Sequence, residues 1–218
     1  MDIKYLGHSS FRIRGKTAAI VTDPFDKQMV GLSFPSVTAD IVTVSHEHAD
    51  HNYVESVTSR DDASPIMIIR GPGEYEVQGV KIVGIHTFHD HENGALRGTN
   101  TIYRIEIDGM SILHCGDLGH VLTDDQLEEI GTVEVLMIPT GGHFTIDEKE
   151  AVKVVNQIEP SIVIPMHYKH PGLAASFSML SPVDSFIAEM EKEPVREQKL
   201  VLTKDKIPLE TTVVVLSI

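Results

Sequence analysis

The sequence predicts an α/β protein in which helices cover β-sheets. Short apolar, β-rich runs dominate the first third of the chain, a hairpin signal lies in the middle, and strands alternate with capped helices in the second half. The chain has 218 residues, of which 41% are hydrophobic, and no linker-like stretch divides it, so it can bury one full core. We therefore expect a single domain over residues 1–218.

Four short strands are expected in the first third, because its apolar runs are interrupted by turn residues such as Gly7, Gly15 and Pro24. These strands cover Ile3–Leu6, Ser10–Ile13, Ala18–Thr22 and Ile41–Val44. A short helix around Tyr53–Thr58 is expected to follow.

The middle of the chain is typical of a β-meander. Its strongest signal is Asp108-Gly109, a residue pair that suits the two-residue turn of a hairpin. A further turn is expected at Gly71-Pro72-Gly73. The strands around these turns are expected at Ile66–Ile69, Val80–Ile85, Thr101–Ile107 and Ser111–His114.

Helices with recognisable starts separate the strands of the second half. The segments from Thr123 to Gln126 and from Thr145 to Glu148 both match capping boxes, which satisfy free backbone amides at a helix start. The helix expected to begin near Ile146 carries an apolar stripe typical of a helix on a sheet, formed by Ala151, Val154, Val155 and Ile158. The other expected elements are strands Val133–Ile138, Ser161–Pro165 and Thr211–Leu216, and a helix from Ser181-Pro182 to about Met190.

The charge and cysteine content exclude some classes of protein. With 18 Lys+Arg against 32 Asp+Glu, the formal net charge is −14, which disfavours a nucleic-acid partner. The single cysteine, Cys115, rules out an intramolecular disulfide and is expected to be a small buried residue at a strand end. No secretory signal and no apolar stretch near the ~20 residues of a membrane span are found, so we expect a cytoplasmic protein without membrane contact.

The segment His46-Glu47-His48-Ala49-Asp50-His51 predicts a metal site, because it places three imidazoles and a carboxylate directly after an apolar run. On a helix, residues two apart would point to nearly opposite sides, whereas chain leaving a strand can converge His46 and His48 on one ion. Asp50 and His51 are then free for a second ion. A solvated loop is the alternative, but burying these groups without metal would leave costly unpaired donors and charges.

The remaining donors must come from other strand ends, where a rigid sheet can place a side chain accurately. Asp117 follows a hairpin and His167 follows a buried apolar run. Between the early cluster and Asp117, spacing alone leaves His86, His89 and His91 equally eligible.

These motifs, in this order, resemble the metallo-β-lactamase superfamily. The resemblance rests on Thr22-Asp23-Pro24-Phe25, the His46–His51 cluster, a middle histidine, Gly116-Asp117 and a late His167. It is strongest to the short single-domain group that includes L-ascorbate-6-phosphate lactonase-like metal-dependent hydrolases, through phrases such as Leu6-Gly7-His8-Ser9-Ser10 and Ile164-Pro165-Met166-His167-Tyr168. The implied fold is a four-layer αββα sandwich.

The resemblance also implies a set of metal ligands. His46, His48 and His89 would hold the first metal, Asp50, His51 and His167 the second, and Asp117 would bridge the two. Asp23 would hydrogen-bond a ligand histidine. The sequence departs from the commonest superfamily pattern at Ser45, where threonine is usual, and at Asn52, but neither residue is a ligand.

Several further residues have less specific expectations. His8, His143 and Tyr168 are expected to support the ligands or contact substrate near the pocket mouth, with plain surface or structural roles as the alternative. No role is assigned to His86, His91, His114, His120 or His170.

The expected function is that of a dinuclear metal-dependent hydrolase acting on a small-molecule ester, lactone or phosphodiester. Zinc suits the donor set, and manganese or iron would also be accepted. Two cations sharing a water would lower its pKa from ~16 toward ~7, and Asp50 or Asp117 would orient the resulting hydroxide. The alternatives are a nucleic-acid-processing phosphodiesterase of the same superfamily and a non-catalytic, metal-dependent binding module. A homo-oligomer is compatible with the sequence.

Overall fold

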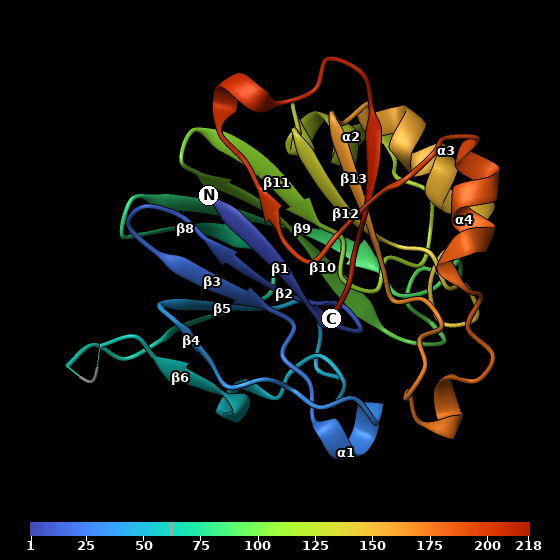
Figure 1. Cartoon of the computed structure of the whole chain (residues 1–218). Coiled ribbons are helices and arrows are strands. Elements are labelled where there is room, and N and C mark those ends of the chain that lie inside the picture. The colour runs from blue at the N-terminus through green and yellow to red at the C-terminus, as the bar shows by residue number, and fades with distance from the viewer. Residues whose placement is uncertain (62) are drawn as a thin grey trace.

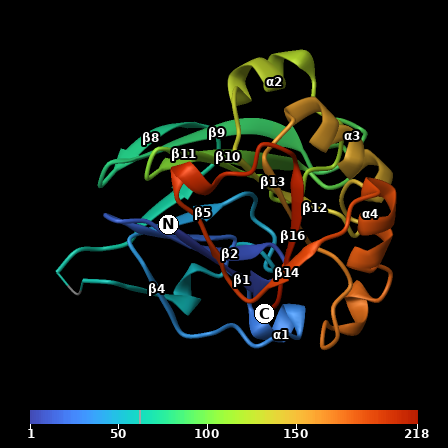
Figure 2. The same ribbon diagram turned by 45° about the horizontal axis from the view of Figure 1, so that its top comes forward.

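Two β-sheets packed face to face form the body of the protein (Figures 1 and 2). The computed structural model describes residues 1–61 and 63–218. The six-stranded sheet has the order β15 (Leu200–Val201), β1 (Asp2–Gly7), β2 (Ser10–Arg14), β3 (Ala19–Thr22), β5 (Ile41–Val44) and β7 (Met67–Arg70). The eight-stranded sheet has the order β14 (Val195–Glu197), β16 (Thr212–Leu216), β13 (Ile162–Met166), β12 (Val135–Pro139), β11 (Met110–His114), β10 (Thr99–Ile107), β9 (Val80–Phe88) and β8 (Gly73–Val77). The predicted α/β sandwich is confirmed.

Side-chain alternation along the strands of the six-stranded sheet separates two apolar layers. Ile20 and Ile41 belong to the main core between the two sheets. Their neighbours Val21 and Val42 face the opposite way, as the period of two along a strand requires, and belong to a second apolar cluster. That cluster includes Val37 and Val57 of a small parallel ribbon formed by β4 (Val37–Ala39) and β6 (Val57–Ser59). The outer face of this sheet is thus covered largely by a ribbon.

Three helices pack against the eight-stranded sheet (Figure 2). Helix α2 (Asp124–Ile130) contacts β9, α3 (Glu148–Ile158) contacts β12, and α4 (Val183–Met190) contacts β13. The expected apolar stripe of α3 is confirmed, since Ala151, Val154 and Val155 are buried. The remaining helical segments are short: α1 (Lys27–Val30) and 3₁₀ turns at Val54–Ser56, Ala175–Phe177 and Lys204–Lys206.

One capping box is confirmed and the other begins two residues later than expected. The hydroxyl of Thr123 accepts a hydrogen bond from the Gln126 amide, and the Gln126 side chain accepts one from the Thr123 amide. The N-cap of α3 is Asp147 rather than Thr145, because the Asp147 carboxylate accepts from both the Lys149 and Glu150 amides. A carboxylate at this position also interacts favourably with the positive end of the helix dipole.

The hairpin at Asp108-Gly109 is confirmed. Both residues have left-handed backbone, with φ of 53° and 75°, and strands β10 and β11 pair antiparallel on either side. The short helix expected around Tyr53–Thr58 is confirmed only as a 3₁₀ helix at Val54–Ser56, which leads directly into β6. The β-branched residues Val57 and Thr58 pair with β4, and burial of Val57 favours the strand.

Strand direction gathers the polar side chains at one edge of the sandwich. Strands β1, β3 and β5 of the six-stranded sheet run the same way, because β2 is antiparallel to both β1 and β3, and β3 is parallel to β5. The same reasoning applies to β9, β11 and β13 in the other sheet.

Among the described residues, none of the helices combines the length and the apolar character that a membrane-spanning helix needs.

Candidate metal centre

Each candidate metal-binding side chain follows the carboxyl end of one of these co-directional strands. His8 follows β1, Asp23 follows β3, His46 to His51 follow β5, His89 follows β9, Asp117 follows the turn after β11, and His167 follows β13. The structure therefore brings together residues from both sheets that are up to 159 positions apart, the separation of His8 and His167.

The first group of donors consists of His46, His48 and His89, whose nitrogens lie within 4.8 Å of one another. The His46 Nε2 atom is 3.0 Å from His48 Nδ1. His46 and His89 are buried, whereas His48 is exposed and lies on the open side of the group. Among the three middle histidines, only His89 joins this group. His86 is exposed and lines a neighbouring groove with His46 and His48 without belonging to the donor group, and His91 pairs with Glu150 at 2.7 Å.

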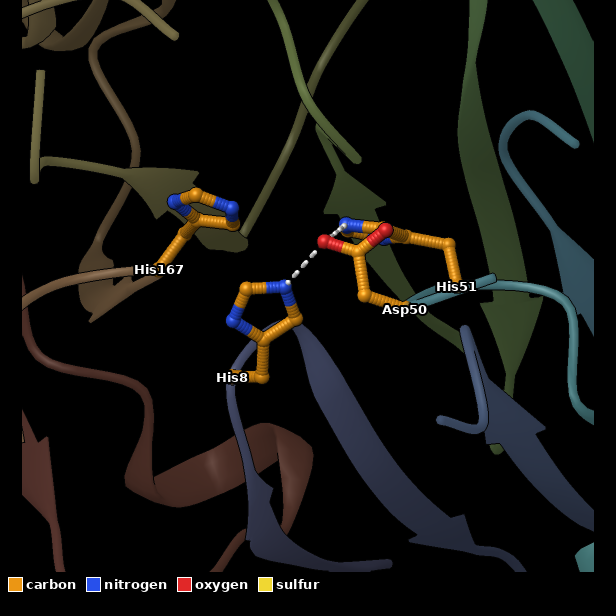
Figure 3. A group of neighbouring side chains, drawn as sticks. All are labelled: His8, Asp50, His51 and His167. Atoms are coloured by element: carbon orange, nitrogen blue, oxygen red, sulfur yellow. Dashed lines mark hydrogen bonds and ion pairs between the residues drawn. The ribbon is translucent and has the colours of Figure 1, made fainter. Parts of the chain in front are cut away.

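The second group consists of His8, Asp50, His51 and His167 (Figure 3). Its four side chains come from three strand ends and turn toward one another. The His8 Nε2 atom is 3.0 Å from Asp50 Oδ2, and the His8 and His167 rings lie 4.2 Å apart. Because a carboxylate only accepts, His8 donates through Nε2 in this contact.

Asp117 lies between the two groups and contacts both. Its Oδ2 is 3.3 Å from His89 Nε2 and 3.4 Å from His167 Nε2, and its Oδ1 is 3.3 Å from His51 Nε2. The Asp117 amide donates to Asn100 Oδ1 at 2.9 Å, which fixes the backbone at this point. All seven residues of the ligand set that the resemblance implied are therefore near neighbours in space.

Asp23 supports histidines of both groups. Its Oδ2 accepts from His51 Nδ1 at 2.9 Å and from the Ser45 hydroxyl at 2.6 Å. Since that hydroxyl donates to Asp23, it is free to accept from His46 Nδ1, 2.9 Å away. When His51 is neutral, Asp23 thus selects the tautomer in which its Nε2 carries a lone pair, and Ser45 does the same for His46. Position 45 therefore requires a hydroxyl group, which serine and threonine both provide.

Three residues of the site have strained backbone. His8, Asp23 and His167 have φ of 57°, 40° and 51°, in the left-handed region that non-glycine residues rarely adopt. Such conformations cost on the order of 1–3 kcal/mol each and persist where the surrounding structure holds them. Here the His8 carbonyl accepts from the His167 amide at 2.8 Å and from the Tyr5 hydroxyl at 2.7 Å, which ties the two sheets together beneath the site.

Electrostatics keep most of these groups in the protonation state that metal binding needs. Burial lowers the pKa of His46 and of His167 to about 3, so both imidazoles are neutral at physiological pH. Burial alone would raise the pKa of Asp117, but the surrounding histidines, His167 and His51 foremost, hold it well below its usual range. His51 differs. Burial lowers its pKa, but Asp117 and Asp50 raise it by more than burial lowers it, so the pKa lies well above its ordinary value.

Unpartnered buried atoms show that these residues fit a cation. Within the described chain, the buried atoms without a hydrogen-bond partner include Nε2 of His51 and of His167, and Oδ1 of Asp117. Leaving several buried polar atoms unpaired in one place is costly, and native proteins avoid it unless another group satisfies them. Imidazole nitrogens and carboxylate oxygens converging on common points are the donors that zinc and similar divalent metals take.

A cavity of about 400 Å³ opens beside the donors. Its lining includes residues of the two groups, among them His48, Asp50, His89 and Asp117. It also includes Met29, Arg97, Phe144 and Phe177. The sequence carried no signal for these last four residues, because they lie on loops and short turns without a periodic pattern.

Two residues expected near the pocket mouth are not among those that line the cavity, although His143 contacts two that do, Arg97 and Phe144. The His143 side chain is exposed, and its ring contacts Phe144 at 4.5 Å between centroids. Tyr168 is buried, packs 6.2 Å from the Tyr5 ring and lines a different groove with Lys169 and Arg196. Burial raises the pKa of Tyr168 to about 12, so its phenol stays protonated at neutral pH.

The histidines to which no role was assigned, and the cysteine, have structural surroundings. His114 Nε2 donates to the Ser9 carbonyl at 2.8 Å, and His120 Nε2 accepts from the Phe88 amide at 3.1 Å. His170 is half-buried, with Nδ1 2.7 Å from the Pro171 carbonyl. Cys115 is fully buried, as expected, and burial raises the pKa of its thiol.

Comparison with known proteins agrees with this geometry. A family model described as a beta-lactamase superfamily domain matches residues 2–167. The chain belongs to this superfamily. It is 33% identical over 199 residues to a UPF0173 metal-dependent hydrolase of Thermococcus onnurineus, covering 80% of this chain and 88% of that protein. A UPF0173 metal-dependent hydrolase of Thermococcus kodakarensis is 32% identical over 195 residues, covering 77% and 84%.

Solved structures extend the similarity over nearly the whole chain. A Thermotoga maritima protein assigned as a Zn-dependent hydrolase of the metallo-β-lactamase superfamily is 39% identical, with a TM-score of 0.80 over 99% of this chain and 97% of that one. The metallo hydrolase Igni18 of Ignicoccus hospitalis shares the fold at 20% identity, with a TM-score of 0.65 over 97% and 94%. The protein is thus a metal-dependent hydrolase of the metallo-β-lactamase superfamily.

Proposed function

We propose that this superfamily member is a dinuclear hydrolase of a small-molecule ester, lactone or phosphodiester. His46, His48 and His89 would hold one divalent cation, and Asp50, His51 and His167 a second, with Asp117 shared between them. The observation that carries the proposal is the position of Asp117, whose two oxygens lie 3.3 to 3.4 Å from histidines of both groups.

Charge supports two cations. Asp23, Asp50 and Asp117 are three buried carboxylates in one site, and the pKa of each is lowered, because their histidine neighbours outweigh burial. Buried carboxylates need compensating positive charge. The protonated His51 supplies part of it without metal. Two divalent cations would supply more than enough, as is normal for sites where bound ions are the largest local charges.

Zinc is the metal we propose, since imidazole and carboxylate donors suit it, and manganese and iron are the alternatives that the same donors accept. Bound divalent cations supply Lewis acidity: they lower the pKa of water so that hydroxide forms near neutral pH, and they polarise a carbonyl or phosphoryl oxygen. The residues of the chain would then position the attacking water and accept its proton.

Asp50 is the residue that we assign to proton transfer. Its side chain is 12% exposed, against 3% for Asp117, and it lines the cavity. His8 holds Oδ2 of Asp50, so Oδ1 is the atom available to accept the proton of an attacking water. Asp117, more deeply buried among four histidines, holds the two donor groups together.

The cavity favours a small substrate. A volume of about 400 Å³ is within the range of small-molecule sites. The apolar lining residues Met29, Phe144 and Phe177 would pack against the body of the substrate, while the reacting bond would lie at Asp50 and Asp117. No side-chain nucleophile is needed.

The test combines metal analysis with turnover. Protein purified without chelator is expected to carry about two transition-metal ions per chain by elemental analysis, and to hydrolyse 4-nitrophenyl hexanoate, a γ-lactone or bis(4-nitrophenyl) phosphate. A single-stranded RNA serves as the nucleic-acid comparison. Protein without stoichiometric metal would contradict the proposal. Thermal stabilisation by these compounds without product would indicate a binding module instead.

A further inference from the structure

Arg97 places a cationic side chain at the candidate active site. It lies on the loop between β9 and β10 and lines the same cavity as Asp50, His89 and Asp117. The side chain is half-buried.

The loop that carries Arg97 is anchored by Asp90. The two oxygens of this carboxylate accept from four backbone amides, those of Glu92, Gly94, Leu96 and Arg97, at 2.7 to 3.0 Å. The amide of Gly98 in turn donates to the Gly94 carbonyl at 3.0 Å. The backbone of Arg97 is therefore fixed before any ligand arrives, which lowers the entropic cost of binding through its side chain.

The guanidinium of Arg97 is positioned but not neutralised. Its Cζ lies 5.0 Å from the centroid of the Phe144 ring, and Nη2 donates a long 3.4 Å bond to the His143 carbonyl. Within residues 1–61 and 63–218, no carboxylate lies within ion-pair distance of it. Arg70 provides the contrast, since its Nη1 is held by both oxygens of Glu47 at 2.6 and 2.7 Å.

We propose that Arg97 binds an anionic group of the substrate, a carboxylate or a phosphate, while the scissile bond lies at the metal donors. This rests on the proposed function for the reaction, but the anion subsite itself is carried by the geometry of Arg97. A planar guanidinium offers a fork of N–H donors that matches the two oxygens of either anion. Stacking on Phe144 keeps that fork in the cavity.

The overall charge makes this local cation decisive. At −14, the chain as a whole repels anions, so an anionic substrate needs specific positive groups in the cavity. The cavity is small and partly apolar, which fits a compact acid or phosphate ester rather than a polymer.

The first test measures anion binding without turnover. Succinate and inorganic phosphate are titrated calorimetrically into metal-loaded wild type and the variants Arg97→Gln, Arg97→Lys and Arg196→Gln. Arg196 is an exposed arginine paired with Asp184, so its loss changes net charge equally without touching the cavity. Arg97→Gln is expected to lower the affinity for at least one anion by about 10- to 100-fold, and Arg97→Lys to retain part of that affinity. Arg196→Gln is expected to change the affinity by less than about two-fold.

The two anions identify the class of ligand. The one whose affinity falls more in Arg97→Gln names the group that the subsite prefers. Equal affinities in wild type and Arg97→Gln for both anions, or no binding of either by wild type, would overturn the proposal. Circular dichroism monitors folding of each variant, and Arg97→Lys carries the comparison if the glutamine variant is unfolded.

The second test separates the subsite from the reaction. Mono(4-nitrophenyl) adipate and 4-nitrophenyl hexanoate share their chain length and leaving group but differ in the terminal carboxylate. If Arg97 binds that carboxylate, Arg97→Gln raises KM for the adipate ester by a much larger factor than KM for the hexanoate ester. Equal losses on both esters would indicate a merely structural role and contradict the subsite.

The two proposals fail in different ways. Arg97-dependent binding of succinate or phosphate without hydrolysis of the two esters, the γ-lactone or bis(4-nitrophenyl) phosphate would contradict the proposed reaction and support the anion subsite. Hydrolysis of both esters with no dependence on Arg97 would support the hydrolase and overturn the subsite.

Discussion

The imidazole of His8 donates a 3.0 Å hydrogen bond to the carboxylate of Asp50, although 42 residues separate them in the chain. His8 follows β1 and Asp50 lies beyond β5, so the contact joins two strand ends of one sheet. Through its carbonyl, His8 also accepts from the amide of His167, which belongs to the other sheet. One residue thus positions two of the donors that we assign to the second metal.

Replacing His8 tests this positioning role. His8→Ala is expected to lower the affinity for the second cation by roughly 10- to 100-fold, with the fold retained. This is the usual cost of losing a residue that orients a metal ligand. His8→Gln, whose side-chain amide can still donate to Asp50, should recover part of the affinity. Competition with a chromophoric chelator measures both. Wild-type affinity in His8→Ala would show that Asp50 needs no support.

Ser45 offers a matched pair of variants at the first cation. Ser45→Ala removes the hydroxyl between Asp23 and His46, so the His46 tautomer is no longer selected. We expect a loss of about ten-fold in metal affinity or more. Ser45→Thr keeps the hydroxyl and should remain within a few-fold of wild type. If the alanine and threonine variants had the same metal affinity, the Ser45 hydroxyl would have no role in orienting His46.

Asp117 is expected to control both cations. Asp117→Asn keeps the shape of the side chain but removes the charge shared by the two groups, and Asp117→Ala removes the donor altogether. In both variants the metal content should fall from about two ions to fewer than one per chain. Activity should be lost, while the circular dichroism spectrum stays unchanged. Asp184→Asn is the control, since Asp184 is exposed and is not among the residues that line the cavity with Asp117. An unaffected Asp117→Asn would remove Asp117 from the shared position.

Metal binding is expected to release protons. Without metal, Asp117 and Asp50 raise the pKa of His51 well above its usual value, against the lowering effect of burial, so His51 carries a proton at neutral pH. A cation needs the neutral imidazole and must displace that proton, so affinity falls as the pH is lowered. Calorimetry in buffers of different ionisation enthalpy measures the release. Binding with no buffer dependence near neutral pH would contradict the raised pKa of His51.

Much of the site was predictable because strand ends were. The apolar runs before His46 and His167 form strands in the structure, and the Asp108-Gly109 hairpin fixes the direction of the strand that leads to Asp117. Parallel direction then places their ends together, which is why donors distant in sequence meet. Spacing alone left three middle histidines open, since the choice depends on where β9 ends, and it ends one residue before His89.

Other features depended on contacts that a single sequence pattern does not carry. The segment Tyr53–Thr58 forms a 3₁₀ helix and the start of a strand because Val57, on β6, is buried in one apolar cluster with Val21 and Val42 of the six-stranded sheet. His8 was assigned only to the neighbourhood of the pocket, because its short turn gave no indication of Asp50. Arg97 gave no signal at all: its place in the cavity depends on a loop held by Asp90.

The central claim is that two donor groups sharing Asp117 hold two cations. Anomalous X-ray diffraction from crystals of the native holoprotein, recorded at the absorption edge of the metal found by elemental analysis, tests it most directly. We expect two separate peaks, one among His46, His48 and His89 and the other among Asp50, His51 and His167, with Asp117 between them. A single peak, or peaks away from Asp117, would contradict the dinuclear site.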